Sequence, residues 1–407
     1  MAEGRAKGDS TDVLSPARVR SDLLSVSDDD RGIRASEEIA GSVLLAAPEV
    51  GDATPDDPAS TPRIPPRLYR GDVARLYHRW PRPIVIVSDG AYGLRSFPGD
   101  PSTADGLARW YEPHVAAWTE RSLPSTTLWF WNTELGWATV HPLLARNGWE
   151  FRNCHIWDKG VGHVAGNSNT RTLRKFPVVS EICVQYVRDV RLPVRGRLVP
   201  LKVWLRHEWR RAGLSLHLAN TACGVANAGT RKYFTQCHLW YFPPPEAFAR
   251  LADYANRHGA PSGRPYFSLD GERPATGLEW ARLRAKFHCR AGITNVWREP
   301  AMRGNERLKR TNRTACVHAN QKPLKLLARI IEASSDPGDV VWEPFGGLCS
   351  VAVAAYRTGR ACYSAERLAD FHRLAAGRIR GEAAEGRDQA SGCDGADGAC
   401  SAVRFPG

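Results

Sequence analysis

Two short stretches, far apart in the sequence, place residues that could do chemistry directly after buried strands. The first is Asp89-Gly90-Ala91-Tyr92, which follows the β-branched run P-I-V-I-V-S at residues 83–88. The second covers residues 339–350, D-V-V-W-E-P-F-G-G-L-C-S, where an apolar run ends on an acid and a glycine pair opens a helical pattern. Both patterns are typical of a parallel strand that ends in a tight turn.

The first stretch combines groups that suit an exocyclic amine. The carboxylate of Asp89 and the carbonyl of Gly90 can accept the two N–H bonds of the amine, and the ring of Tyr92 can stack on the attached base. Positioning, and stabilisation of positive charge that develops on the nitrogen, would then supply most of the rate acceleration. The alternative interpretation is an Asp-Gly turn that serves only the backbone.

The second stretch predicts a site for a nucleoside cofactor. Its glycines let a ligand approach the backbone N–H groups at the start of a helix. About twenty residues later, a predicted strand at residues 361–365 ends on Glu366, whose carboxylate can accept hydrogen bonds from both hydroxyls of a ribose. The alternative is a glycine pair that only relieves crowding in a strand-to-helix turn.

Alternating strands and helices predict the sheet that positions these stretches. We expect strands at residues 83–88, 126–131, 149–157 and 178–187, and helices at residues 104–121 and 136–146. This order predicts an α/β fold, a Rossmann-like core with a mostly parallel sheet and helices on both faces. Because ligands bind such sheets beyond the carboxyl ends of the strands, Asp89 and Glu343 are expected at one edge.

Charge and composition bound the kind of partner. Residues 1–66 hold 13 acids and 7 bases, a net charge of −6; because the whole chain carries +13, the remainder carries +19. A folded region this basic indicates a polyanion partner. No apolar run approaches the roughly 20 residues that span a bilayer, so we expect no membrane partner. The ten cysteines lack a C-x-x-C pair, which favours reduced thiols and no metal site.

The middle of the chain has a pattern typical of nucleic-acid contact. Residues 201–236 predict a helix, a break, a second helix, a glycine turn and a short exposed helix that carries Asn227, Thr230, Arg231 and Lys232. This resembles a helix-turn-helix, whose second helix enters the major groove of DNA. The alternative is a helical hairpin with a solvated basic face. Aromatic and basic residues remain interleaved through residues 243–313, as in surfaces that stack on bases.

Together these features resemble the amino-methylating DNA methyltransferases, which transfer a methyl group from S-adenosylmethionine to adenine N6 or cytosine N4. The motif order is that of their β class, with the catalytic motif first and the cofactor motif last. Asp89 to Tyr92 stands in the place of the D/S/N-P-P-Y motif. H-A-N-Q-K-P-L-K-L-L at residues 318–327 resembles the H-x-x-Q-K-P helix, and D-P-G-D-V-V-W-E-P-F-G-G at residues 336–347 resembles the D-P-F-x-G turn. The resemblance covers roughly residues 67–380.

The resemblance implies roles for individual residues. Asp89, Gly90 and Tyr92 would hold the amine. The cofactor site would comprise Gln321, Lys322 and Pro323 at the methionine end, Glu343, Phe345 and Gly347 along the body, and Glu366 at the ribose. The sequence departs from the family pattern at three places: Gly90-Ala91 replaces both prolines, Glu343 replaces aspartate, and Leu348-Cys349 replaces Ser-Gly.

The resemblance also implies the domain order and the partners. We expect a disordered acidic tail at residues 1–66, a catalytic half at 67–187, a helical target-recognition insert at 188–313, a cofactor half at 314–380 and a disordered tail at 381–407. The substrate would be double-stranded DNA with the target base flipped out, in the cytoplasm at the nucleoid, with a cognate restriction endonuclease as a further partner. Aspartate at position 89 favours adenine N6 over cytosine N4.

Two other functions stay open at this point. The altered proline pair and glycine turn fit a DNA-binding protein on a decayed methyltransferase scaffold. The basic insert also fits an RNA amino-methyltransferase.

Overall fold

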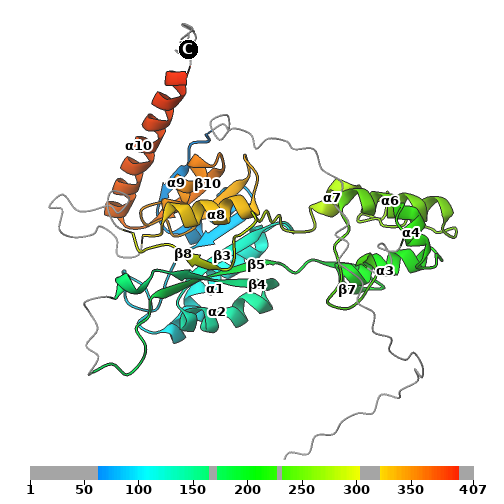
Figure 1. Cartoon of the computed structure of the whole chain (residues 1–407), viewed down its shortest axis with the longest axis horizontal. Coiled ribbons are helices and arrows are strands. Elements are labelled where there is room, and N and C mark those ends of the chain that lie inside the picture. The colour runs from blue at the N-terminus through cyan, green and yellow to red at the C-terminus, as the bar shows by residue number, and fades with distance from the viewer. Residues whose placement is uncertain (1–62, 165–171, 227–231, 303–320, 394–407) are drawn as a thin grey trace, which may run out of the picture. The chain divides into compact units, whose positions relative to one another are not determined.

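The computed structural model describes residues 63–164, 172–226, 232–302 and 321–393, with side chains as far as residue 384. Within these ranges, one sheet of eight strands forms the centre (Figure 1). Its strands, in spatial order, are β1 (Arg67–Arg70), β10 (Ala361–Glu366), β9 (Val340–Glu343), β2 (Val85–Ser88), β3 (Thr127–Asn132), β5 (Ser180–Arg188), β4 (Trp149–Asp158) and β8 (Val296–Arg298).

The sheet is mostly parallel. Strand β2 pairs in parallel with β9 on one side, where Val85 lies opposite Val341, and with β3 on the other. Strand β5 runs antiparallel to both of its neighbours, β3 and β4. The predicted Rossmann-like α/β fold is therefore confirmed, and β2, β3, β4, β9 and β10 all end at the same edge of the sheet.

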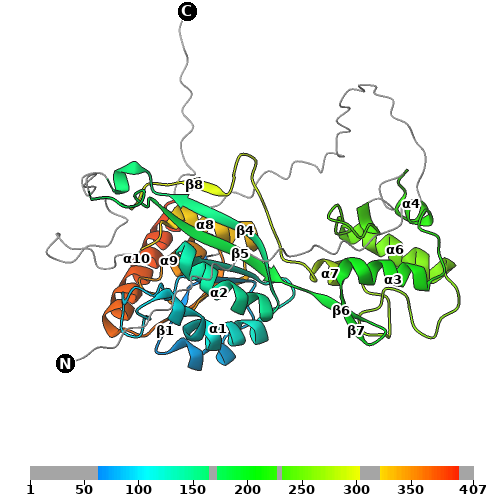
Figure 2. The ribbon, with the colours of Figure 1, turned by 90° about the horizontal axis from the view of Figure 1, so that it is seen from below.

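Helices cover both faces of the sheet (Figure 2). Helices α1 (Leu107–Arg121) and α2 (Glu134–Arg146) pack on one face, and α8 (Leu324–Ser334) and α9 (Ser350–Arg357) pack on the other. The pleat of β2 separates the two cores, because Ile86 points into the first while Val85 and Val87 point into the second. A central strand buried on both faces needs the continuous apolar run that the sequence shows.

Residues 191–283 form a separate core that contains the hairpin β6 (Arg191–Val194) and β7 (Arg197–Pro200). Its helices are α3 (Leu201–Arg211), α4 (Leu218–Cys223), α6 (Pro245–His258) and α7 (Gly277–Ala281). The core packs tryptophan rings against one another, and Trp280 stacks on Phe248 with 4.5 Å between ring centroids. The insert is thus helical as predicted, apart from a hairpin that the sequence analysis missed.

Two predicted boundaries are wrong. Strand β8 lies inside the predicted insert at residues 188–313, yet it pairs with β4 of the main sheet. The predicted disordered tail at 381–407 conflicts with helix α10 (Ala369–Cys393), which is regular as far as residue 393. Of the predicted acidic tail at 1–66, residues 1–62 lie outside the described ranges.

Candidate functional site

The two stretches singled out in the sequence meet at the carboxyl edge of the sheet. Asp89 follows β2 and Glu343 ends β9, and these strands are parallel neighbours. The turns touch at Gly90, where an added Cβ atom would lie 2.7 Å from the ring of Phe345 and 2.8 Å from the hydroxyl of Tyr111. Only glycine allows this approach without a shift of the neighbours. The prediction that both stretches lie at one edge is confirmed.

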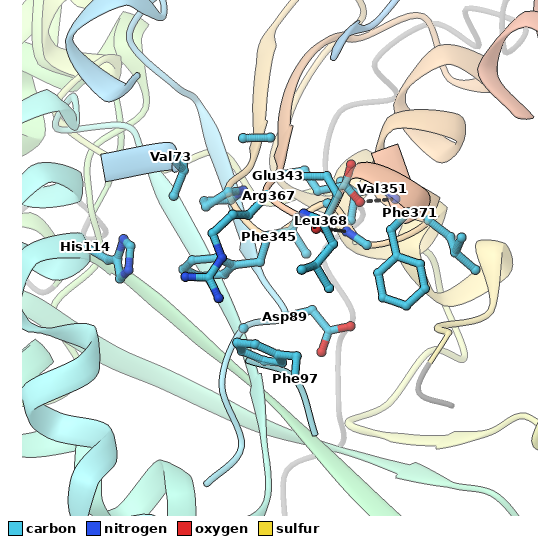
Figure 3. Close-up of a pocket in the computed structure, with 18 of the residues that line it drawn as sticks. Val73, Asp89, Phe97, His114, Glu343, Phe345, Val351, Arg367, Leu368 and Phe371 are labelled. Carbon is cyan, nitrogen blue, oxygen red and sulfur yellow. Dashed lines mark hydrogen bonds between the residues drawn. The ribbon is translucent and has the colours of Figure 1, made fainter. Parts of the chain in front are cut away.

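A cavity of about 370 Å³ lies between the turns (Figure 3). Its size falls in the range of small-molecule sites, about 300 to 1,000 Å³. It is lined by predicted site residues and by residues that the sequence analysis did not single out. The predicted ones are Asp89, Gly90, Gln321, Lys322, Glu343, Phe345, Gly347 and Glu366, and the added ones include Asp72, Phe97, Trp110, His114, Arg367 and Phe371.

Aromatic side chains form one wall of this cavity. The ring of Phe345 lies 5.1 Å from the ring of Trp110 and 4.9 Å from that of His114, measured between centroids. Burial lowers the pKa of His114 to about 4, so its imidazole is neutral at pH 7. The wall is therefore uncharged and suits the faces of a flat, apolar ring.

Glu366, at the end of β10, places a carboxylate on the opposite side of the glycine turn. Its Oε2 accepts a hydrogen bond from the N–H of Gly347 at 2.8 Å, and its Oε1 accepts one from the N–H of Leu368 at 2.6 Å. Burial raises the pKa of Glu366, and these backbone donors lower it. Because a carboxylate offers about four acceptor positions, both oxygens can still accept from a diol.

Glu343 lines the cavity but also serves the helix behind it. Its Oε1 accepts from the N–H of Val351 at 2.9 Å and its Oε2 from the N–H of Ala352 at 3.2 Å, in the first turn of α9. Burial raises the pKa of Glu343 to about 8, although both backbone hydrogen bonds lower it. The sequence predicted Glu343 only as a cofactor contact, and these bonds give the side chain a capping role as well.

Asp89 is held by a lysine from the other half of the chain. Nζ of Lys322 lies 2.8 Å from Oδ1 and 2.9 Å from Oδ2 of Asp89. The Lys322 side chain is 2% exposed and that of Asp89 is 23% exposed, so the carboxylate is the more accessible of the two groups. Burial lowers the pKa of Lys322, but the carboxylates of Asp89 and Glu181 outweigh it and raise the pKa.

Two further charged residues, which the sequence analysis did not assign to the site, complete this cluster. Oε1 of Glu181 lies 3.0 Å from Nζ of Lys322, and its Oε2 lies 3.0 Å from Nζ of Lys159. Burial raises the pKa of Glu181, but the two lysines outweigh it and lower the pKa. Glu181 is the one charged residue of the segment S-E-I-C-V-Q-Y-V, and this was the signal that could have identified it.

Tyr92, for which the sequence predicts a stacking role, lies against two carboxylates. Its hydroxyl lies 2.8 Å from Oδ1 of Asp89 and 2.6 Å from Oε1 of Glu181, so its single proton is shared between two acceptors, and the residue is 8% exposed. The ring is covered by Lys322, whose Nζ lies 5.3 Å from the ring centroid. Tyr92 therefore contacts the Asp89 carboxylate through its hydroxyl, and among the described residues it does not line the cavity.

The backbone of the first turn is held from the side. The carbonyl of Ala91 accepts from the hydroxyl of Tyr111 at 3.1 Å and from the side-chain amide of Asn132 at 2.9 Å. These bonds replace part of the restraint that two prolines would give, so the Gly-Ala pair does not leave the turn loose.

The remaining predicted residues are placed as follows. Gln321 lines the cavity, whereas Pro323 is the N-cap of α8 and lies outside the lining. Asn227, Thr230 and Arg231 fall outside the described residues, and Lys232, the next residue in the sequence, is exposed.

In the described part of the chain, no cluster of three His, Cys, Asp or Glu side chains could hold a metal ion. Nor does any helix described here have the length and apolar character to cross a membrane.

Comparisons with known proteins point to one family. Residues 264–377 match the model of the N6_N4_Mtase family, described as DNA methylase. The DNA adenine methyltransferase YhdJ of Escherichia coli is 39% identical over 62 residues, which is 15% of this chain and 21% of that protein. The type II methyltransferase M.HinfI of Haemophilus influenzae is 35% identical over 86 residues, which is 21% of this chain and 24% of that protein.

The chain thus spans about a fifth to a quarter of the length of these curated relatives. Among solved structures, the cytosine-N4-specific PvuII DNA methyltransferase matches 82% of this chain and 96% of its own, at 11% identity and a TM-score of 0.45. The complex of M1.HpyAVI with SAM matches 77% of this chain and 98% of its own, at 12% identity and a TM-score of 0.40.

Proposed function

We propose, from the family match over residues 264–377 and the geometry of the cavity, that this protein is an S-adenosylmethionine-dependent DNA methyltransferase acting on an exocyclic amine. The observation that carries the proposal is the contact between Gly90 and Phe345, which joins the amine-binding turn to the nucleoside-binding turn. Adenine N6 is the favoured target because of the aspartate at position 89, and cytosine N4 is the alternative.

The cavity suits the cofactor on three counts. The aromatic wall of Phe345 and Trp110 would border the adenine, and the open acceptor positions of Glu366 would receive the ribose hydroxyls. The glycine turn can lie close against β10, because a Cβ at Gly346 would lie 2.7 Å from Ser364 Oγ and 3.0 Å from the carbonyl of Ala365. When bound, S-adenosylmethionine supplies an electrophilic methyl group.

Asp89 acts on the substrate amine. Its partly exposed carboxylate accepts an N–H of the amine, which orients the nitrogen lone pair toward the cavity. As the nitrogen becomes positively charged, the carboxylate stabilises that charge from a fixed position. Lys322 and Tyr92 hold the carboxylate from the buried side, so it needs little reorganisation.

DNA is the proposed substrate, and the charge of the chain supports this. Outside residues 1–66 the net charge is +19, which favours binding to phosphates. Asn227, Thr230, Arg231 and Lys232 are the proposed contacts of the insert with the duplex. A base inside a duplex would be flipped out to reach Asp89. We further propose a nucleoid-associated, cytoplasmic protein with a cognate restriction endonuclease.

The test is methyl transfer from labelled cofactor to duplex DNA by the wild type and by Asp89→Ala. Loss of the carboxylate should reduce the rate by at least about 100-fold, as for other groups that stabilise developing charge. Cofactor binding, measured by equilibrium dialysis, should change little because the aromatic wall and Glu366 remain. Asp336→Asn is the control, since Asp336 pairs with Lys286 and His288 at the far end of β9.

Full activity of Asp89→Ala would reject the role of Asp89. Absence of saturable cofactor binding by the wild type would instead favour the decayed scaffold. Competition between duplex DNA and folded RNA in the methyl-transfer assay distinguishes a DNA methyltransferase from an RNA methyltransferase. Methylation-sensitive sequencing of DNA from cells that express the protein would give the target base and its sequence context.

A further inference from the structure

The charged cluster beneath Asp89 is buried more deeply than an ion-pair network needs to be. Lys322 is 2% exposed and Glu181 is 6% exposed, and they lie on segments from opposite halves of the chain. Removing such charges from water is expensive, and apolar residues of the same size would often stabilise a core equally well. A buried pair next to a reactive carboxylate therefore indicates a functional demand.

The geometry gives each member one task. Lys322 contacts both oxygens of Asp89, at 2.8 and 2.9 Å, and this fixes the plane of the carboxylate. Glu181 contacts Lys322 at 3.0 Å and Lys159 at 3.0 Å, so it holds the ammonium in place from behind. The cluster contains two acids and two bases, which leaves it neutral overall.

We propose that Glu181 is a positioning residue that acts through Lys322 to hold the Asp89 carboxylate in the orientation that accepts the target amine. This inference rests on the proposed function, because Asp89 is its point of action. Glu181 does not line the cavity among the described residues, so it acts on the amine only through Lys322 and Tyr92. It is therefore distinct from the residues that touch cofactor or base.

The first measurement is the single-turnover rate of methyl transfer by Glu181→Gln, which keeps the size of the side chain and removes its charge. A displacement of about 1 Å can cost about 100-fold in rate, so we expect a loss of at least about tenfold. The Kd for S-adenosylmethionine should stay within about threefold of the wild-type value, well below the tenfold change that about 1.4 kcal/mol would give. Asp336→Asn, which removes an ion-paired carboxylate remote from the cluster, should match the wild type.

The pH profile provides a measurement that a purely structural role would not change. The groups that face Lys322 are Asp89 and Tyr92 after β2, and Glu181 and Cys183 on β5, with Lys159 behind Glu181. Burial lowers the pKa of Lys322, and two carboxylates raise it. With one carboxylate removed, Lys322 should lose its proton at a lower pH. The alkaline loss of activity should therefore begin earlier in Glu181→Gln than in the wild type.

Crystal structures of the wild type and Glu181→Gln make the inference testable without activity. We expect the Asp89 carboxylate to rotate or become disordered only in the variant. An unchanged Asp89 in the variant, or a wild-type rate and pH profile, would overturn the inference. If the wild type transfers no methyl group while Asp89 is released in the variant, the proposed function fails but the positioning role stands.

A second variant covers the case in which Glu181→Gln does not fold. Lys159→Met removes the outer partner of Glu181 and keeps the apolar stem that packs on Trp157, whose ring centroid lies 4.7 Å from Nζ. This variant should lower the rate in the same direction by a smaller factor. No change in rate or in the Asp89 orientation would argue against Glu181.

Discussion

At the scale of single residues, the site depends on a contact that leaves no room for a side chain. Gly90 lies against Phe345 and Tyr111, both of which belong to the aromatic wall or its support. The sequence analysis identified Gly90 through its carbonyl, but the close packing of its Cα could not be predicted. That packing depends on Phe345, which lies 255 positions further along the chain.

Gly90→Ala should weaken both cofactor binding and methyl transfer. The new Cβ would lie 2.7 to 2.8 Å from Phe345 and the Tyr111 hydroxyl, so the wall must shift. Overpacking of this kind costs about 1 to 3 kcal/mol, which corresponds to about 5- to 150-fold in affinity if the cavity absorbs it. Calorimetric titration with S-adenosylmethionine measures the change. Gly377→Ala in α10 is the matched control, because its Cβ meets nothing within 4 Å.

Glu343 gives a prediction about pH and stability. Its pKa in the folded protein is about 8, raised by burial from an ordinary value of 4.5. A carboxyl group with a raised pKa binds more protons when folded, so its contribution favours folding below pH 4.5 and is lost as the pH rises toward 8. The unfolding free energy of the wild type should therefore fall more steeply over this range than that of Glu343→Gln.

Urea titrations at several pH values measure this difference. Parallel curves for the two proteins would show that Glu343 is not protonated in the folded state.

At the scale of elements, long and strongly patterned segments were predicted well, and short ones were not. Strands β2, β3, β4 and β5 match their predicted ranges within about two residues. In β2, β3 and β5 the signal is a largely apolar run, whereas β4 mixes polar residues with aromatic ones. The hairpin β6–β7 was missed because Pro193 and Pro200 lie in its strands, and proline argues against a strand. Strand β8 has three residues and carries no periodic signal.

The insert core depends on one buried acid. The side chain of Glu208 on α3 is fully buried and pairs with Arg211 and Arg264, each at 2.7 Å, while its Oε2 also accepts from the N–H of Phe267. Glu208→Ala would leave two arginines without this partner, at a cost of about 3 to 5 kcal/mol for a broken buried pair. Hydrogen exchange should then increase in α3 and α6, with loss of the proposed DNA binding.

Cofactor binding should survive in Glu208→Ala, because the cavity is formed by the main sheet. Asp253→Asn is the control in the same core: its pair with Arg257 is exposed, and such pairs contribute about 0 to 1 kcal/mol. Equal exchange in the two variants would show that Glu208 does not hold the insert together.

At the scale of the whole molecule, sequence order and spatial order differ. The motif order predicted that two distant turns meet, and the parallel pairing of β2 with β9 confirms it. The partner of Asp89 could not be predicted, because Lys322 is 233 positions away and its motif indicated a cofactor contact. Buried ion pairs between distant segments carry no local periodicity, so a single sequence gives no direct signal for them.

The strand order also has a consequence for biosynthesis. Strands β10 and β9 lie between β1 and β2, although they are made some 270 residues later. During synthesis, β1 and β2 are therefore made before the two strands that pair between them, and this part of the sheet can form only after residues 340–366 have been made. The turn at Asp89 and the turn at Gly347 therefore cannot meet co-translationally until the strands that carry the second turn have left the ribosome.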